Sequence, residues 1–75
     1  MNDEQRLVLQ KCIQESGIID LMAVAQRTNR SKFREAVINP LLDKGLLEMT
    51  IPDKPNSSKQ KYRITPKGKE ILSIL

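Results

Sequence analysis

Two groups of cationic and hydroxyl side chains are the residues of this chain that could carry chemistry. The first group lies in residues 28–34 and comprises Thr28, Asn29, Arg30, Ser31, Lys32 and Arg34. The second group follows residue 53 and comprises Lys54, Ser57, Ser58, Lys59, Lys61 and Arg63. Ammonium, guanidinium and hydroxyl groups donate hydrogen bonds to phosphate oxygens, and arginine can also pair with the edge of a guanine base. Both groups therefore indicate the binding of a polyanion rather than bond-breaking chemistry.

The composition includes few of the side chains that enzymes use for catalysis. The 75 residues include no histidine and one cysteine, so the commonest metal ligand and acid/base group is missing and no intrachain disulfide can form. We expect no metal site, no cofactor and no enzymatic activity. Cys12 falls on an apolar stripe, where a small packed side chain is expected rather than a reactive thiol.

The apolar residues occur in short runs, far below the ~20 consecutive residues that span a bilayer, and no secretory segment follows Met1. We therefore expect a cytoplasmic chain with no membrane partner. The net charge of +4 is unevenly placed, because residues 1–26 sum to −2, residues 27–49 to +2 and residues 50–75 to +4. This gradient favours an acidic partner.

Three helices are expected to position the first group. Val8, Leu9, Cys12 and Ile13 form one stripe of a helix over residues 3–15, which ends at Gly17. Ile18 and Ile19 are expected to be an extended link, with Asp20 as the cap of a second, short helix. A third helix follows a turn at residues 28–30, is expected to begin with a cap at Ser31, and points Phe33, Ala36, Val37 and Leu41 toward the core.

The other side of this third helix carries a mixed surface. It presents Ser31, Glu35, Ile38 and Leu42, and neither a carboxylate nor large apolar groups suit contact with phosphate. This surface is explained either by an apolar partner or by a kink at Pro40 that turns Leu42 inward. Both explanations stay open at the level of sequence.

Two alternating segments predict the strands that carry the second group. In residues 46–51 and 60–65, apolar and polar side chains alternate as in half-buried strands, with Tyr62 and Ile64 facing inward. The two prolines and small polar residues between them predict an exposed hairpin loop, a wing. Gln60 could bond an adenine or tie this loop to its own backbone. Thr65 followed by Pro66 predicts the start of a final helix that runs to the end of the chain.

These elements predict an α+β fold of the winged helix-turn-helix type. Its three-helix core is followed by a two- to three-stranded antiparallel wing and a C-terminal helix. We expect residues 1–75 to be one such domain.

The sequence over roughly residues 18–70 also resembles a particular winged-helix module, and the motifs that carry the resemblance follow residue 40. The motifs are Thr50-Ile51-Pro52-Asp53-Lys54-Pro55, Ser58-Lys59-Gln60-Lys61-Tyr62-Arg63 and the helix start Thr65-Pro66-Lys67-Gly68. They are similar to the C-terminal domain of Fic-family proteins and of bacterial regulators related to RecG helicase or carrying a divergent AAA domain. The resemblance implies a module excised from a larger protein that keeps its chemistry upstream, since no Fic-type His-Pro-Phe motif occurs here.

Two functions follow as alternatives. In the first, double-stranded DNA is the partner: the third helix enters the major groove and the wing contacts phosphates, in the service of transcriptional or helicase-related regulation. In the second, the module docks on the upstream domain of its parent protein or forms a homodimer without binding DNA. The apolar residues expected to form that interface are Ile38, Leu42, Ile71, Leu72 and Leu75.

Overall fold

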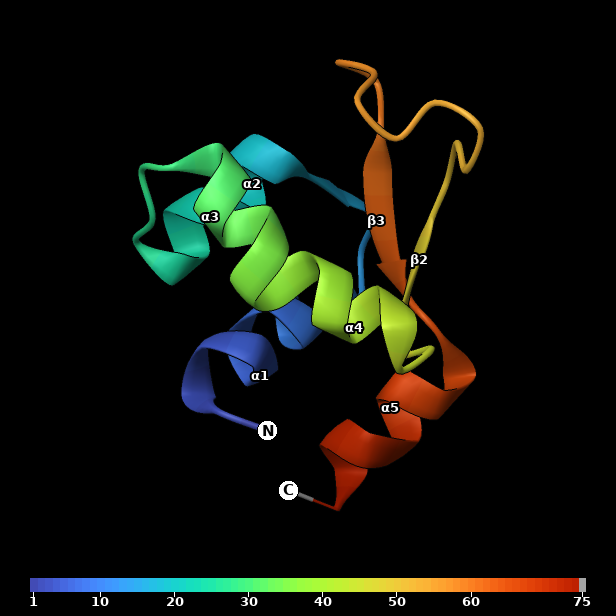
Figure 1. Ribbon diagram of the computed structural model, residues 1–75. Coiled ribbons are helices and arrows are strands. Elements are labelled where there is room, and N and C mark those ends of the chain that lie inside the picture. The colour runs from blue at the N-terminus through green and yellow to red at the C-terminus, as the bar shows by residue number, and fades with distance from the viewer. Residues whose placement is uncertain (75) are drawn as a thin grey trace.

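The computed structural model of the protein describes residues 1–74 and shows a small α+β fold (Figure 1). In chain order, its elements are α1 (Asp3–Lys11), β1 (Ser16–Gly17), α2 (Ile18–Ala25), α3 (Arg30–Phe33), a π-helical segment η1 (Arg34–Ile38), α4 (Asn39–Asp43), β2 (Leu47–Met49), β3 (Lys61–Ile64) and α5 (Pro66–Ser73). Because α3, η1 and α4 are continuous, residues 1–74 form four helical stretches and a three-stranded sheet. None of the helices in this part of the chain has the length and apolar character needed to cross a membrane.

The first helix is shorter than its sequence pattern predicts. Asn2 and Gln5 form a capping box at its start, but the helix ends at Lys11 instead of reaching residue 15. The hydroxyl of Ser16 donates to the carbonyls of Lys11 and Gln14, which stabilises the turn out of the helix. As a result Ile13 lies outside the helix and is 59% exposed, so its predicted place on the buried stripe is wrong.

The second helix begins earlier than expected. Ser16 and Gly17 pair with Tyr62 and Lys61 of β3, so the extended segment ends at Gly17, which is the N-cap of α2. Ile18 and Ile19 are therefore the first two helical residues, and the predictions of an extended link and of a cap at Asp20 are both wrong. Local β propensity at two isoleucines is outweighed here by the register of a strand pair that sequence alone does not specify.

The third helical stretch contains the largest departure from the predicted pattern. The backbone N–H of Asn39 donates to the carbonyl of Arg34, five residues earlier, so η1 holds one residue more per turn than an α-helix. This wide turn directly precedes Pro40, whose ring would clash with the carbonyl of Ala36 in a regular α-helix and whose nitrogen has no proton to donate.

The extra residue changes which side chains face the core. Ile38 is fully buried and Ala36 is exposed, the reverse of the prediction. Leu42 is partly buried against the core, as the alternative of a distortion at Pro40 required. Phe33, Val37 and Leu41 are buried as predicted.

The sheet has the order β1-β3-β2, and both neighbours of β3 are antiparallel to it. Tyr62 in the central strand lies opposite Ser16 on one side and Met49 on the other. Tyr62 and Ile64 are buried while Lys61 and Arg63 are exposed, which confirms the predicted alternation of β3.

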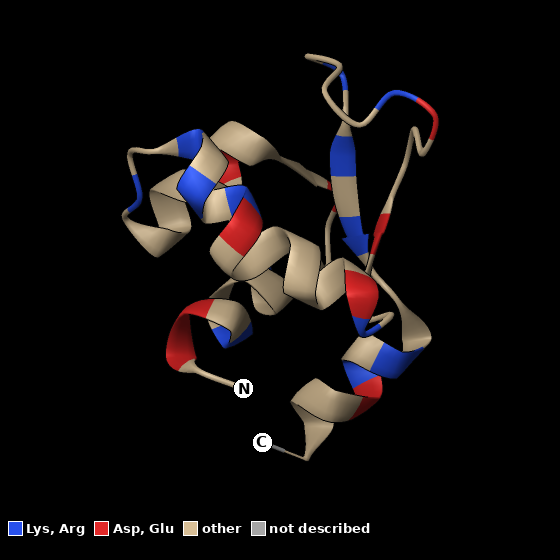
Figure 2. Cartoon of the chain, in the orientation of Figure 1, with Lys and Arg blue, Asp and Glu red and all other residues tan. Residues whose placement is uncertain are grey.

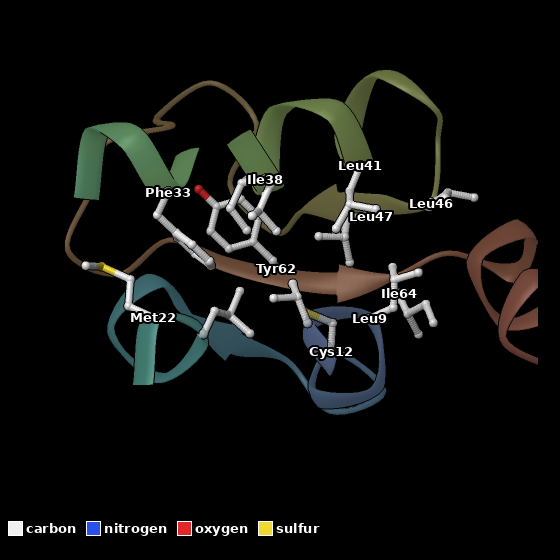
Figure 3. Close-up of a cluster of buried hydrophobic side chains, with 13 residues drawn as sticks. Leu9, Cys12, Met22, Phe33, Ile38, Leu41, Leu46, Leu47, Tyr62 and Ile64 are labelled. Carbon is white, nitrogen blue, oxygen red and sulfur yellow. The ribbon is translucent and has the colours of Figure 1, made fainter. Parts of the chain in front are cut away.

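The core lies between the helices and this sheet (Figure 3). Figure 3 shows its side chains on both sides of β3, with α4 across from α1 and α2. Phe33, Leu9 and Leu21 are the largest of the fully buried side chains. Cys12 belongs to the same cluster and is fully buried, which confirms its predicted packing role.

The final helix closes the fold against the end of α4. Thr65 caps α5 by accepting from the N–H of Gly68, and Pro66 is the first helical residue, as predicted. Gly45, with a positive φ of 72°, ends α4, and the N–H of Leu46 donates to the carbonyl of Leu41. Figure 1 shows α5 beside α1 at the end of the molecule opposite the β2–β3 loop.

Candidate functional site

The first basic segment, residues 28–34, forms the turn between α2 and α3 and the first turns of the third helical stretch. Asn29 caps this helix, because its Oδ1 accepts from the backbone N–H of Lys32 at 3.0 Å. The cap is thus two residues earlier than the predicted one at Ser31, which lies inside the helix. The cap uses one lone pair of the Asn29 oxygen and leaves both N–H groups of its side-chain amide free to donate to a ligand.

The side chains of this basic segment differ in their exposure to solvent. Thr28, Arg30, Ser31 and Lys32 are exposed, while Arg34 is half-buried. The Nε of Arg34 is fully covered and has no hydrogen-bond partner within residues 1–74. Arg30 and Arg34 are four residues apart, and therefore project from the same side of the helix.

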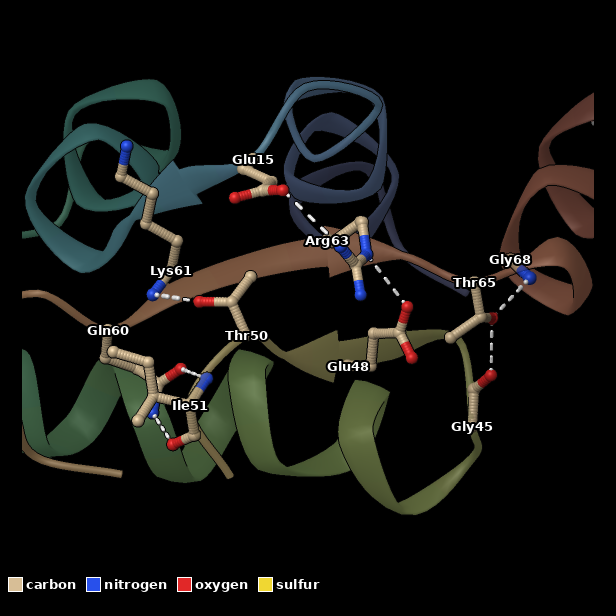
Figure 4. Close-up of polar contacts among 10 residues, drawn as sticks. All are labelled: Glu15, Gly45, Glu48, Thr50, Ile51, Gln60, Lys61, Arg63, Thr65 and Gly68. Atoms are coloured by element: carbon tan, nitrogen blue, oxygen red, sulfur yellow. Dashed lines mark hydrogen bonds and ion pairs between the residues drawn. The ribbon is translucent and has the colours of Figure 1, made fainter. Parts of the chain in front are cut away.

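The second basic segment lies in the β2–β3 loop, here residues 50–60, and in β3. Gln60 is 5% exposed, and its amide accepts from the N–H of Ile51 at 3.0 Å and donates to the carbonyls of Ile51 and Lys54 (Figure 4). The Ser57 hydroxyl accepts from the backbone N–H of Lys59 at 3.1 Å. Gln60 thus ties the loop to its own backbone, which is one of the two roles that the sequence left open.

Arg63 has a different environment from the lysines near it. Its guanidinium pairs with Glu48 at 2.9 Å and with Glu15 at 3.4 Å, as Figure 4 shows. The hydrogen bond from Arg63 to Glu48 raises the pKa of the arginine, so the guanidinium stays charged beside these two side chains. Lys54, Lys59 and Lys61 are exposed and form no ion pair within residues 1–74. The predicted phosphate contact of Arg63 would compete with two carboxylates, whereas those of the lysines would not.

A cavity brings the two basic segments together. Its volume is about 300 Å³, and we call it the α3–loop cavity; it is lined by Gly17, Ile18, Ile19, Asp20, Arg30, Arg34, Asn56, Ser57, Ser58, Gln60 and Tyr62. Four predicted site residues therefore share one hollow: Arg30, Arg34, Ser57 and Ser58. The other eight predicted residues do not line it: Thr28, Asn29, Ser31, Lys32, Lys54, Lys59, Lys61 and Arg63.

Sequence reasoning missed the rest of this lining. The start of α2, residues 17–20, forms one wall of the cavity, and no spacing in the sequence links it to residues 30–34 or 56–58. It also missed Arg27, which makes two hydrogen bonds to Glu4, one of them at 2.8 Å. This pair joins the turn after α2 to α1, and the Arg27 hydrogen bond lowers the pKa of Glu4.

The predicted docking surface is largely part of the core. Ile38 is fully buried, and Leu42, Ile71 and Leu72 are partly buried and packed against the core cluster. The prediction that Ile38 is available to a partner is therefore wrong, because η1 turns it inward. Leu75 lies outside the described residues. Within residues 1–74 the most exposed large apolar side chains are Ile74 at 75%, Ile19 at 61% and Ile13 at 59%.

Charges are distributed over this surface as the sequence indicated. Figure 2 shows lysines and arginines at the start of α3, in the β2–β3 loop and along β3, on the same end of the molecule. The acidic residues in or beside the two segments are Asp20, Glu35 and Asp53, together with Glu15 and Glu48, which pair with Arg63. Cations exceed carboxylates on this end of the molecule.

Comparison with known proteins identifies the family. The family described as "Filamentation induced by cAMP protein Fic-like, C-terminal domain" matches residues 4–65. The fold is similar to part of the crystal structure of a Fic family protein from Desulfovibrio desulfuricans G20, with a TM-score of 0.75 and 33% sequence identity. That match covers 91% of this chain and 21% of the solved protein, so the chain spans about a fifth of its relative's length. Among curated proteins, no sequence matches significantly.

The family match and the structural match agree with each other and with the predicted resemblance to Fic-family proteins. The matched region includes α1 to β3 and thus both basic segments. The chain belongs to the Fic-like C-terminal domain family.

Proposed function

We propose that this domain is a winged-helix module that binds double-stranded DNA. In this proposal α2 and the third helical stretch form the helix-turn-helix, and the β2–β3 hairpin is the wing. The domain serves its larger Fic-family protein as a binding unit and has no catalytic activity of its own. A regulatory role in transcription, and a relation to RecG-helicase-related proteins, are extensions of the same proposal.

The observation that supports DNA binding is the pairing state of the cations. Arg30, Lys32 and Arg34 on the helix, and Lys54, Lys59 and Lys61 on the hairpin, form no ion pairs within residues 1–74. Arg6, Arg27 and Arg63 are paired with carboxylates. The remaining lysines, at positions 11, 44, 67 and 69, are also unpaired within the described residues but lie outside these two elements. Unpaired cations on two adjacent elements form the electrostatic surface that a phosphate backbone requires.

The two elements would act differently. The first turn of α3 would enter the major groove, where Arg30, Ser31 and Lys32 can reach base edges or flanking phosphates. The hairpin offers Lys54, Lys59 and Lys61 with small hydroxyls, which suits contacts to the backbone that set register and affinity but do not read sequence. Glu35 is exposed on the same helix and would limit how far the helix can lie along the groove.

A titration of the isotopically labelled chain with a short mixed-sequence duplex, at low and then at moderate salt, tests this function. Amide shifts confined to residues 28–35 and 54–63 that fade with salt would support it. The apparent affinity should fall with a slope of about −0.9 in log–log form for each phosphate contacted. No shift in either segment at low salt would refute DNA binding.

Protein docking is the second candidate function. The observation that favours it is the exposure of Ile13, Ile19 and Ile74. A partner would be either the upstream part of the Fic-family protein or a second copy of the chain. In the same titration, concentration-dependent broadening around these three residues without any response to the duplex would favour docking over DNA binding.

A further inference from the structure

We propose that the α3–loop cavity is a pocket for a single phosphate group. Its occupant would be a phosphate of the DNA backbone or the phosphate of a free ester. Where the occupant is a backbone phosphate, this inference rests on the proposed function. Binding of a free phosphate ester does not depend on it.

One wall of the cavity carries two arginines that have no ion-pair partner. Arg30 and Arg34 both line it, and neither is paired with a carboxylate within residues 1–74. The Nε of Arg34 is covered from solvent and lacks a hydrogen-bond acceptor among the described residues. Because this Nε is covered, the terminal nitrogens of the two guanidinium groups are the donors that an anionic oxygen in the cavity can reach. Two guanidinium groups one helical turn apart can bind different oxygens of the same phosphate.

The opposite wall supplies neutral donors. Asn56, Ser57 and Ser58 line the cavity from the β2–β3 loop, with an amide and two hydroxyl groups. The hydroxyl of Ser57 accepts one hydrogen bond from the loop backbone, which leaves its proton free to donate. The loop is held in place by Gln60, which also lines the cavity. The donors are thus presented by a fixed loop rather than by a free one.

The third wall is the start of α2. Gly17 caps this helix without a side-chain hydrogen bond, so the positive end of the helix adds to the two arginines. Asp20 also lines the cavity and is the one carboxylate that opposes an anion there. Ile18, Ile19 and Tyr62 complete the lining and would contact the carbon atoms of a phosphate ester. A volume of about 300 Å³ is enough for a phosphate and the first part of its ester group.

The test uses inorganic phosphate and glycerol 3-phosphate as probes of the 75-residue chain, with chloride at equal ionic strength as the reference. Millimolar phosphate should shift the amides of Gly17, Arg34 and Ser57. Arg34→Gln should weaken phosphate binding by about tenfold or more, because a hydrogen bond to a charged group is lost. Asp20→Asn should strengthen it. Lys32→Gln removes a cation from the same helix outside the cavity and should have no comparable effect on phosphate.

The same variants are then titrated with the duplex. If phosphate binds as described and Arg34→Gln weakens the duplex more than Lys32→Gln does, the pocket holds a backbone phosphate. If phosphate binds but no duplex does, the pocket stands as a site for a free ester and the proposed DNA function fails. If the duplex binds but phosphate causes no shift, the pocket is refuted and the DNA function stands. If Arg34→Gln does not fold, the pocket is tested with Arg30→Gln and Asp20→Asn instead. Phosphate binding that is unchanged in both variants would refute the pocket.

Discussion

Gln60 hydrogen-bonds both backbone polar groups of Ile51, accepting from its N–H and donating to its carbonyl. A third hydrogen bond, from Gln60 to the carbonyl of Lys54 at 2.9 Å, reaches further into the β2–β3 loop. The Gln60 side chain is almost completely buried, so these bonds are sheltered from water. One side chain thereby sets the shape of a loop whose prolines exclude regular secondary structure.

Gln60→Ala should loosen the loop before it unfolds the domain. The N–H of Ile51 loses its partner, whereas its carbonyl keeps the hydrogen bond from the backbone N–H of Lys54, so the change should cost about 1–3 kcal/mol in the free energy of unfolding. Hydrogen exchange should accelerate at Ile51. The amides of α1 should lose only as much protection as the drop in global stability accounts for. Ser58→Ala, at an exposed position of the same loop, is the control. Equal exchange at Ile51 in the wild type and Gln60→Ala would show that Gln60 does not hold the loop.

Lys61 and Arg63 lie two residues apart on one strand but should contribute differently to the proposed DNA binding. Lys61→Gln removes an unpaired cation and should reduce the salt slope of duplex binding by about 0.9. Replacing Arg63 and its partner Glu48 by Gln together leaves the local charge unchanged and should leave the slope nearly unchanged. Lys69→Gln, on α5, controls for net charge. Equal slopes for Lys61→Gln and Lys69→Gln would contradict a role of β3 in phosphate contact.

Gly68 marks the closest approach of α5 to the rest of the fold. A Cβ added there would lie 2.4 Å from the carbonyl oxygen of Leu46 and 2.7 Å from the side chain of Ile64. Gly68→Ala should therefore lower the free energy of unfolding by about 1–3 kcal/mol, even though alanine is the better helix former. Denaturant unfolding measures the change, with the exposed Ser73→Ala on the same helix as control. A stabilised Gly68→Ala protein would mean that α5 packs less closely.

The thiol of Cys12 should be unreactive in the folded protein. Burial raises the pKa of Cys12 to about 12, and its side chain is fully covered. Because the thiolate is the reactive form, labelling by a disulfide reagent at pH 8 should occur only after the domain unfolds. The labelling rate should rise with urea in parallel with the loss of helical circular dichroism. Fast labelling in the absence of urea would place Cys12 at the surface instead.

The ion pair between Glu4 and Arg27 should make stability depend on acid pH. The folded state lowers the pKa of Glu4 below its ordinary 4.5, so the folded state is favoured when this carboxylate is ionised. The stabilisation by ionised Glu4 is complete above the pKa that Glu4 has in the unfolded chain. It is lost as the pH falls through the lower pKa that Glu4 has in the folded protein. Glu4→Gln should therefore be less stable than the wild type at pH 7, and the difference should shrink at pH 3.

Thermal unfolding at both pH values checks this prediction. Asp3→Asn is the matched control, since Asp3 is 93% exposed in its pair with Arg6 and an exposed pair contributes little to stability. A difference between Glu4→Gln and the wild type that does not change with pH would contradict a role for the ionised pair.

Several features of this domain could be predicted because their signals are local. The cap at Thr65 with Pro66 behind it, and the alternation of Lys61 to Ile64, involve residues within a few positions of one another. The buried positions of Phe33 and Cys12 follow from helical periodicity in the same way. Charge is additive along the chain, so the basic character of residues 50–75 needed no structure.

Other features depended on the tertiary structure because they join distant segments or break a regular period. The π-helical turn before Pro40 buries Ile38, which a regular helical wheel places on the opposite side. Glu15 lies 48 positions before Arg63 in the sequence, yet it pairs with Arg63 in the fold. Together with Glu48 it neutralises a cation that the sequence alone presents as unpaired. The α3–loop cavity joins the start of α2, the start of the third helical stretch and the β2–β3 loop. The sequence by itself determined how much positive charge the domain carries, and long-range packing decided which of those charges remain available to a ligand.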